Sequence, residues 1–201
     1  MGTNSHPERV LRLANERGLV RARDLAGHRI PRATLSRLVA SGRLVQISRG
    51  LYALPKHSRS EQHQLAEIAA RTRHGAFCLL TALRFHELTT QSPHEVWLAI
   101  PTTARAPKLR YPPLRIVRFS GQALTRGVDM HVVDGVTIHV YSVAKTVADC
   151  FKYRNKIGLD VALEALRESR REKRATNDEL WRYAKICRVA NIMRPYMESI
   201  E

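Results

Sequence analysis

Residues 18–54 read GLVRARDLAGHRIPRATLSRLVASGRLVQISRGLYAL and decide the fold of the N-terminal part of the chain. Their pattern predicts two short helices, near residues 21–26 and 31–41, joined by a turn at Gly27. Pro31 suits the first turn of the second helix, because its missing N–H removes no intrahelical hydrogen bond. Apolar or small residues recur along this helix at the i, i+3, i+4, i+7 spacing of a buried face: Leu35, Leu38, Val39 and Gly42.

Two short strands are expected after the second helix, over residues 44–47 and 51–54. They meet at a tight turn around Gly50, and residues 19–20 can add a third strand. An earlier helix that ends at Gly18 completes a three-helix core. Three helices with a strand pair behind them make a winged helix-turn-helix.

The outer face of the second helix is expected to carry small and hydroxylated side chains around one central arginine. Ser36 and Arg37 point away from the apolar stripe, and Thr34 lies on its flank. Such a surface fits the major groove of double-stranded DNA, although an ordinary solvated helix face is the alternative. Arginines at the helix start and on the wing would reach phosphates on either side. The predicted DNA-binding residues are Arg32, Ala33, Thr34, Ser36, Arg37, Arg43 and Arg49.

The chain is strongly basic. Its 201 residues include 34 Lys and Arg against 18 Asp and Glu, which gives a formal net charge of +16 and a pI near 10.7. Residues 1–59 hold about twelve of the cations and three of the acids. This concentration predicts association with a polyanion, although a basic protein kept soluble by charge repulsion is the alternative.

The sequence shows neither a membrane span nor a secretory signal. No apolar run approaches the roughly 18 residues that a membrane-spanning helix needs, and the first ten residues lack the form of a signal peptide. The three cysteines, Cys78, Cys150 and Cys187, lie in apolar patterns, which indicates buried free thiols. We therefore expect a reduced, cytoplasmic protein without a cofactor.

A polar connector over residues 55–60 separates two predicted domains, residues 1–56 and residues 60–201. The expected fold class is α+β, with the winged helix-turn-helix followed by a mixed α+β C-terminal domain. The expected strands of the second domain are residues 95–100, 114–119, 130–133 and 136–140, the last two joined by an Asp134-Gly135 turn. Its expected helices lie near residues 61–73, 77–88, 143–151, 159–166, 177–187 and 192–200, with Pro195 in the first turn of the last.

Two charged features of the second domain have more than one interpretation. Lys145, Asp149 and Lys152 lie opposite the apolar face of their helix, which favours a solvated charge face over a partner-binding surface. Residues 167–174 are denser in charge. They suit equally a solvated helix end, an extension of the DNA-facing surface, or a site for an acidic partner.

Catalysis and metal binding have little support in the residue types. Asp129 and Asp134 resemble metal-binding carboxylates on adjacent strands, but no Glu-x-Lys or Asp-x-Asp accompanies them and Asp134 suits the hairpin turn. His131 and His139 lie on the paired strands without an evident third ligand. No Gly-rich phosphate loop occurs in the sequence. We therefore expect neither an enzyme nor a metal site.

The chain, from the helix-turn-helix onward, resembles the AbiEi family of antitoxins, the transcriptional-regulator half of AbiE-type (type IV) toxin–antitoxin systems. The N-terminal pattern of the family occurs here as Gly18…Asp24-Leu25, Leu35-x-x-Leu38-Val39-x-x-Gly42-x-Leu44 and Ile47-x-Arg49-Gly50-Leu51-Tyr52. A looser match continues through Ala82-Leu83, Val96–Pro101, Asp134-Gly135 and Thr146-Val147-Ala148-Asp149.

The resemblance implies a winged-helix domain followed by an antitoxin domain. It also implies repression of the protein's own operon, often at inverted repeats, which would bind two copies of the chain. The implied partner is an AbiEii-like nucleotidyltransferase toxin, with direct contact left open. The alternatives are an antitoxin that acts mainly by toxin contact, with the winged helix as a protein-docking module, and a general winged-helix regulator without a toxin partner.

Overall fold

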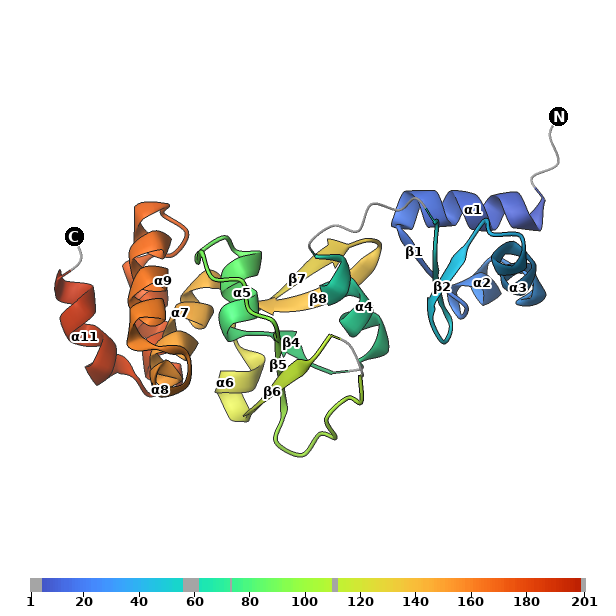
Figure 1. Cartoon of the computed structure of the whole chain (residues 1–201). Coiled ribbons are helices and arrows are strands. Elements are labelled where there is room, and N and C mark those ends of the chain that lie inside the picture. Colours follow the sequence, from blue (N-terminus) through green and yellow to red (C-terminus); the bar gives the residue numbers. More distant parts are fainter. Residues whose placement is uncertain (1–4, 56–61, 73, 110–111, 200–201) are drawn as a thin grey trace. The chain divides into compact units, whose positions relative to one another are not determined.

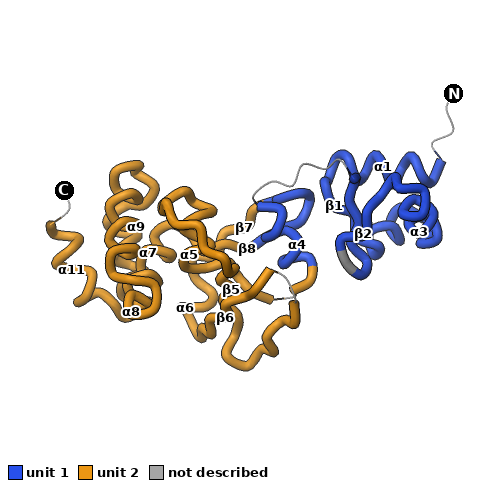
Figure 2. The backbone as a smooth tube through the Cα atoms, viewed as in Figure 1, with its two compact units in different colours: residues 1–70, 132–138 blue, residues 71–131, 139–201 orange. Residues whose placement is uncertain are grey.

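The computed structural model describes residues 5–55, 62–72, 74–109 and 112–199. Contacts within the chain divide it into two compact units (Figure 2). Unit 1 comprises Met1–Ala70 and Val132–Ile138, and unit 2 comprises Arg71–His131 and His139–Glu201. The domain boundary expected between residues 56 and 60 lies outside the described residues, so the predicted domain limits stay a prediction.

Unit 1 begins with the expected winged helix-turn-helix (Figure 1). Its elements are, in order, α1 (His6–Arg17), β1 (Leu19–Arg21), α2 (Asp24–Gly27), α3 (Ala33–Ala40), β2 (Val45–Ser48) and β3 (Leu51–Ala53). The three strands form an antiparallel sheet in the order β1-β3-β2, so the residues expected to add a strand to the wing do so by pairing with β3.

One apolar core holds these elements together. It consists of Val10, Ala14, Val20, Leu25, Ile30, Leu35, Leu38 and Leu44. Leu35 and Leu38 supply the inner face of α3 and are 1% and 3% exposed. Burial of apolar surface is the main stabilising contribution to such a domain, so the inner face of α3 holds the helix against the core. Its opposite face is left to solvent.

Unit 1 also includes the tip of a hairpin formed later in the chain by β7 (Val128–Val133) and β8 (Val136–Tyr141). The backbone N–H of Leu19 donates a hydrogen bond to the carbonyl oxygen of Asp134 over 3.2 Å. The Nδ1 atom of the buried His63, on α4 (His63–Arg71), lies 2.9 Å from Oδ2 of the same aspartate. Asp134 therefore does more than make the expected turn, because it also ties the hairpin tip to the N-terminal chain.

Unit 2 is built from a mixed sheet and helices, which confirms the predicted α+β class. Its further elements are β4 (Ala76–Phe77), α5 (Leu79–Phe85), β5 (Val96–Pro101), β6 (Leu114–Phe119), α6 (Gly121–Thr125), α7 (Val143–Lys152), α8 (Arg154–Ile157), α9 (Leu159–Arg171), α10 (Asn177–Ile186) and α11 (Ala190–Ser199). The sheet has the strand order β6-β5-β4-β8-β7, with β4 antiparallel to β5 and parallel to β8. No helix in the described part of the chain is both long and apolar enough to cross a bilayer.

Two of the expected helices differ from the structure. Residues 76–77 form β4 instead of opening a helix, because Phe77 pairs with Leu98 on one side and Val140 on the other. The following helix therefore begins only at Leu79. The last helix begins at Ala190, so Pro195 lies inside α11 rather than in its first turn and removes one intrahelical hydrogen bond.

The central helix of unit 2 is α7, and it has no solvated charge face. The helices α5, α9, α10 and α11 all pack against it. Nine consecutive residues, from Val143 to Phe151, are consequently buried. Lys145 and Asp149 are 0% exposed, so the expected solvated face is wrong for these two residues, whereas Lys152 is exposed as predicted. Periodicity within one helix does not show how many neighbours surround it.

The three cysteines are free and buried, which confirms the prediction. Burial raises the pKa of the Cys78 and Cys150 thiols well above the ordinary value, and it raises the pKa of Cys187 to about 12. Thiolates, the reactive form of cysteine, are therefore scarce at neutral pH.

Candidate nucleic-acid interface

The outer face of α3 is open to solvent. Ala33, Ser36 and Arg37 are exposed, whereas Leu35 and Leu38 lie in the core of unit 1. The helix therefore presents a face of small side chains with one long cationic side chain at its centre. A face of this kind lets the backbone approach base edges closely, while an arginine can donate two hydrogen bonds to guanine.

Thr34 does not belong to this exposed face. The residue is only 5% exposed. Thr34 lies one helical turn before Leu38, at i and i+4, and about 40° of rotation separates such positions. A residue expected on the flank of the stripe thus falls inside it. The structure therefore moves Thr34 from the flank of the stripe into the buried face of α3, and a role of its hydroxyl in DNA binding stays a prediction.

Three further exposed arginines lie close to α3 along the chain. Arg32 directly precedes the helix, Arg43 lies between the helix and β2, and Arg49 lies in the turn between β2 and β3. None of the ion pairs among the described residues involves these three or Arg37. Their guanidinium groups can therefore donate to an external acceptor without first breaking a contact within the protein.

Two more exposed arginines of the helix-turn-helix, Arg23 and Arg29, are absent from the predicted set. Arg29 lies in the connection between α2 and α3, and Arg23 precedes α2 with its Nε 3.9 Å from Asp24 Oδ1. The signal that points to them is composition, since residues 5–55 contain many arginines and no lysine. Arginine binds phosphate and guanine in a bidentate manner, which lysine cannot do.

A short helix-turn-helix, a three-stranded wing, and exposed arginines on and beside the second helix are features typical of DNA-binding regulators. Residues 8–55 match the AbiEi antitoxins, a family of transcriptional regulators. This stretch, the AbiEi region, runs from α1 through β3, and the match confirms the resemblance for the N-terminal pattern. The match covers less than half of the chain, and no curated protein matches the chain.

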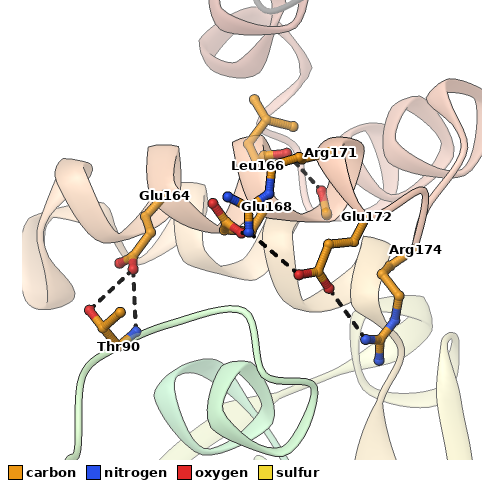
Figure 3. Close-up of polar contacts among 8 residues, drawn as sticks. Thr90, Glu164, Leu166, Glu168, Arg171, Glu172 and Arg174 are labelled. Carbon is orange, nitrogen blue, oxygen red and sulfur yellow. Dashed lines mark hydrogen bonds and ion pairs between the residues drawn. The ribbon is translucent and has the colours of Figure 1, made fainter.

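The charged run at residues 167–174 lies outside the AbiEi region, at the end of α9 (Figure 3). Arg171 forms ion pairs with Glu168 and Glu172. The Nη1 atom of Arg174 lies 3.6 Å from Oε2 of Glu172. Acidic residues within the run thus offset part of its positive charge, which favours the helix-end interpretation over an extended DNA-facing surface.

Other side chains of α9 hold the helices of unit 2 together. Arg170 donates hydrogen bonds of 2.9 Å to the carbonyl oxygen of Met197 and to Oδ1 of Asn177. Glu164 accepts hydrogen bonds from the backbone N–H and the hydroxyl of Thr90, at 3.3 and 3.4 Å (Figure 3). These contacts give α9 a structural role beyond that of a charged surface.

The acids and histidines weighed for metal binding do not converge outside the AbiEi region. Among the described residues, no group of three or more His, Cys, Asp or Glu side chains is placed to hold a metal ion. Asp134 adopts a φ of +49° in the hairpin turn. The ring of His131 lies against that of Phe85, with 4.7 Å between their centroids. Asp134 thus lies in the turn that contacts the N-terminal chain, and the ring of His131 packs against an aromatic neighbour.

Proposed function

We propose that this chain is a DNA-binding antitoxin that represses transcription of its own operon through its winged helix. The observation that carries the proposal is the exposed face of α3, where Arg37 and the arginines near it have no ion-pair partner among the described residues. The net charge of +16 supplies a general attraction to the DNA backbone. The match of residues 8–55 to a family of regulators supports the same role.

The residues of this surface divide into two kinds of contact. Arg37, Ser36 and Ala33 face base edges in the major groove, with Arg37 as the main reader. Arg32, Arg43 and Arg49 contact phosphates and so fix the position of the protein on the duplex. We add Arg29 to the second group because it is exposed next to the start of α3.

The operator and the partner follow from the family resemblance. An operator of inverted repeats requires two copies of the chain related by a twofold axis, so we propose a homodimer on DNA. The proposed toxin is an AbiEii-like nucleotidyltransferase, whether or not the two proteins touch. We further propose that the protein is not an enzyme. We place it in the cytoplasm, because a repressor acts where its operator lies.

Fluorescence anisotropy with DNA from upstream of the chain's own gene tests this function. We expect specific binding that tightens steeply as the salt concentration falls, since several phosphate contacts release counterions. A scrambled duplex of equal length is the control. Equal affinity for both duplexes at moderate salt would contradict sequence-specific repression.

Growth of cells that express the neighbouring toxin tests the antitoxin part separately. We expect the full chain to restore growth. Restored growth together with a co-purified toxin and no DNA binding would favour the alternative in which the winged helix is a protein-docking module. If the full chain does not restore growth, the result would favour the alternative of a winged-helix regulator without a toxin partner.

A further inference from the structure

Unit 2 contains a polar pocket of about 440 Å³ that the proposed DNA-binding function does not use. Val143 and Ala144, the first two residues of α7, line this pocket together with Arg174 and Arg182. Its volume is in the range of small-molecule sites. All its lining residues belong to unit 2 and lie outside the AbiEi region.

The start of α7 offers hydrogen-bond donors to the pocket. First-turn N–H groups have no acceptor within their own helix, and they carry the positive end of the helix dipole. Ser142 is the N-cap residue, where a serine oxygen ordinarily accepts from one of these groups, yet its side chain makes no such bond. Its Oγ has less than 1 Å² of exposed surface and no hydrogen-bond partner among the described residues. Because buried hydroxyls are normally hydrogen-bonded, a buried hydroxyl without a bond indicates that a bound molecule could supply its partner.

Arg174 and Arg182 bring positive charge to the same pocket. The Nη1 atom of Arg174 lies 3.6 Å from Oε2 of Glu172 (Figure 3), and Nη2 of Arg182 lies 4.0 Å from Oε1 of Glu179. Both distances are longer than a hydrogen bond, so the guanidinium donors are still available to an acceptor in the pocket. Two available guanidinium groups beside a helix N-terminus form a donor set that suits an anion.

Two carboxylates and one histidine also line the pocket. Oε2 of Glu179 accepts hydrogen bonds from the N–H and the hydroxyl of Thr176, at 2.9 and 3.0 Å, so this carboxylate already has donors. His86 lies with Nε2 2.7 Å from the carbonyl oxygen of Tyr141, and burial lowers the pKa of His86, which leaves its ring neutral at pH 7. The same hydrogen bonds lower the pKa of Glu179, so it is ionised like the exposed Asp129, and both carboxylates oppose an anion.

We propose that this pocket binds a small anion of the phosphate class, held by the first-turn N–H groups of α7, the hydroxyl of Ser142, and the guanidinium groups of Arg174 and Arg182. Rotation about the Cα–Cβ bond of Ser142 turns its hydroxyl toward the anion. Asp129 weakens the binding through like-charge repulsion. The proposal is independent of DNA recognition by α3.

Calorimetric titration of the full chain with inorganic phosphate, at constant ionic strength and neutral pH, tests the proposal. We expect saturable binding that Arg174→Gln and Arg182→Gln each weaken by about tenfold, because each loses a charge-assisted hydrogen bond. Ser142→Ala should weaken the binding as well. Asp129→Asn should strengthen it, an effect that a merely structural role of Asp129 would not produce.

Two control variants locate the site. Arg171→Gln removes a nearby arginine that does not line the pocket, and Arg37→Ala removes the proposed base reader; neither should change phosphate affinity. Absence of saturable binding, an equal loss in Arg171→Gln, or a loss confined to Arg37→Ala would overturn the proposal. Weaker operator binding by the Arg174→Gln/Arg182→Gln double variant, without any effect on phosphate affinity, would also overturn it in favour of a DNA contact.

Discussion

The ammonium group of Lys145 and the carboxylate of Asp149 form an ion pair within α7, and both side chains are completely buried. The thiol of Cys187 donates to the other carboxylate oxygen over 3.2 Å. The Nζ atom of Lys145 lies 4.2 Å from the ring centroid of Tyr141 and 4.7 Å from that of Phe119. Burial raises the pKa of Asp149, and the adjacent Lys145 opposes that shift. Both charges have lost their contact with water, and each is therefore stabilised mainly by the other.

The first prediction concerns removal of one partner of this pair. Lys145→Met should lower the free energy of unfolding by about 3–5 kcal/mol, because it leaves the Asp149 carboxylate buried without a counter-ion. The variant should regain stability as the pH falls, since a carboxyl group whose pKa is raised in the folded state favours folding when it is protonated. Urea unfolding at several pH values, followed by tryptophan fluorescence, measures both effects.

The double variant Lys145→Met/Asp149→Leu is the matched control. It removes both charges and should recover most of the stability that the single variant loses. If the double variant is as unstable as Lys145→Met, packing volume rather than the unpaired charge explains the loss.

The second prediction concerns Arg37 on the outer face of α3. Arg37→Ala should cost about 1–3 kcal/mol of operator binding and relax sequence preference at one base pair, because a bidentate arginine contact discriminates between bases. Titration against a set of single-base operator variants measures both. Arg12→Ala, which removes an exposed α1 arginine paired with Glu16, is the control. Unchanged operator affinity in Arg37→Ala would rule out its role as base reader.

The third prediction concerns Arg49 in the turn of the wing. Arg49→Ala should weaken binding to all sequences alike, since a phosphate contact carries no base information. The slope of log affinity against log salt concentration should become shallower by about one unit, as one counterion fewer is released. Anisotropy titrations at several salt concentrations on operator and scrambled duplexes measure the slope. A loss confined to the operator would show that Arg49 reads bases instead.

The fourth prediction concerns Gly135 at the hairpin tip. A Cβ atom at this position would lie 2.5 Å from the carbonyl oxygen of Arg17, and Gly135 has a φ of +69°. Gly42 has nearly the same φ, +68°, but nothing within 4 Å of the corresponding Cβ position. Gly135→Ala should therefore lower the melting temperature more than Gly42→Ala, which bears only the backbone cost of about 1–2 kcal/mol. Equal losses would mean that the tip does not pack against Arg17.

The winged helix could be predicted from the sequence because its signals are local. The spacing of Leu35 and Leu38, the Pro31 start and the strand pair around Gly50 each act within a few residues. The same local pattern gave the exposed positions of Ser36 and Arg37. It failed at Thr34, because the width of the buried stripe depends on what packs against α3.

The sequence by itself determined the fold class, the basic surface and the family resemblance, since propensity, periodicity and charge are properties of neighbouring residues. Only the tertiary structure decided that Lys145 and Asp149 lie in the interior, because α5, α9, α10 and α11 pack against α7. The tertiary structure also forms the pocket at the start of α7, because it brings together Asp129, Ser142 and Arg174 from separate parts of the chain. Burial and convergence of distant residues depend on packing between elements, which no single stretch of sequence encodes.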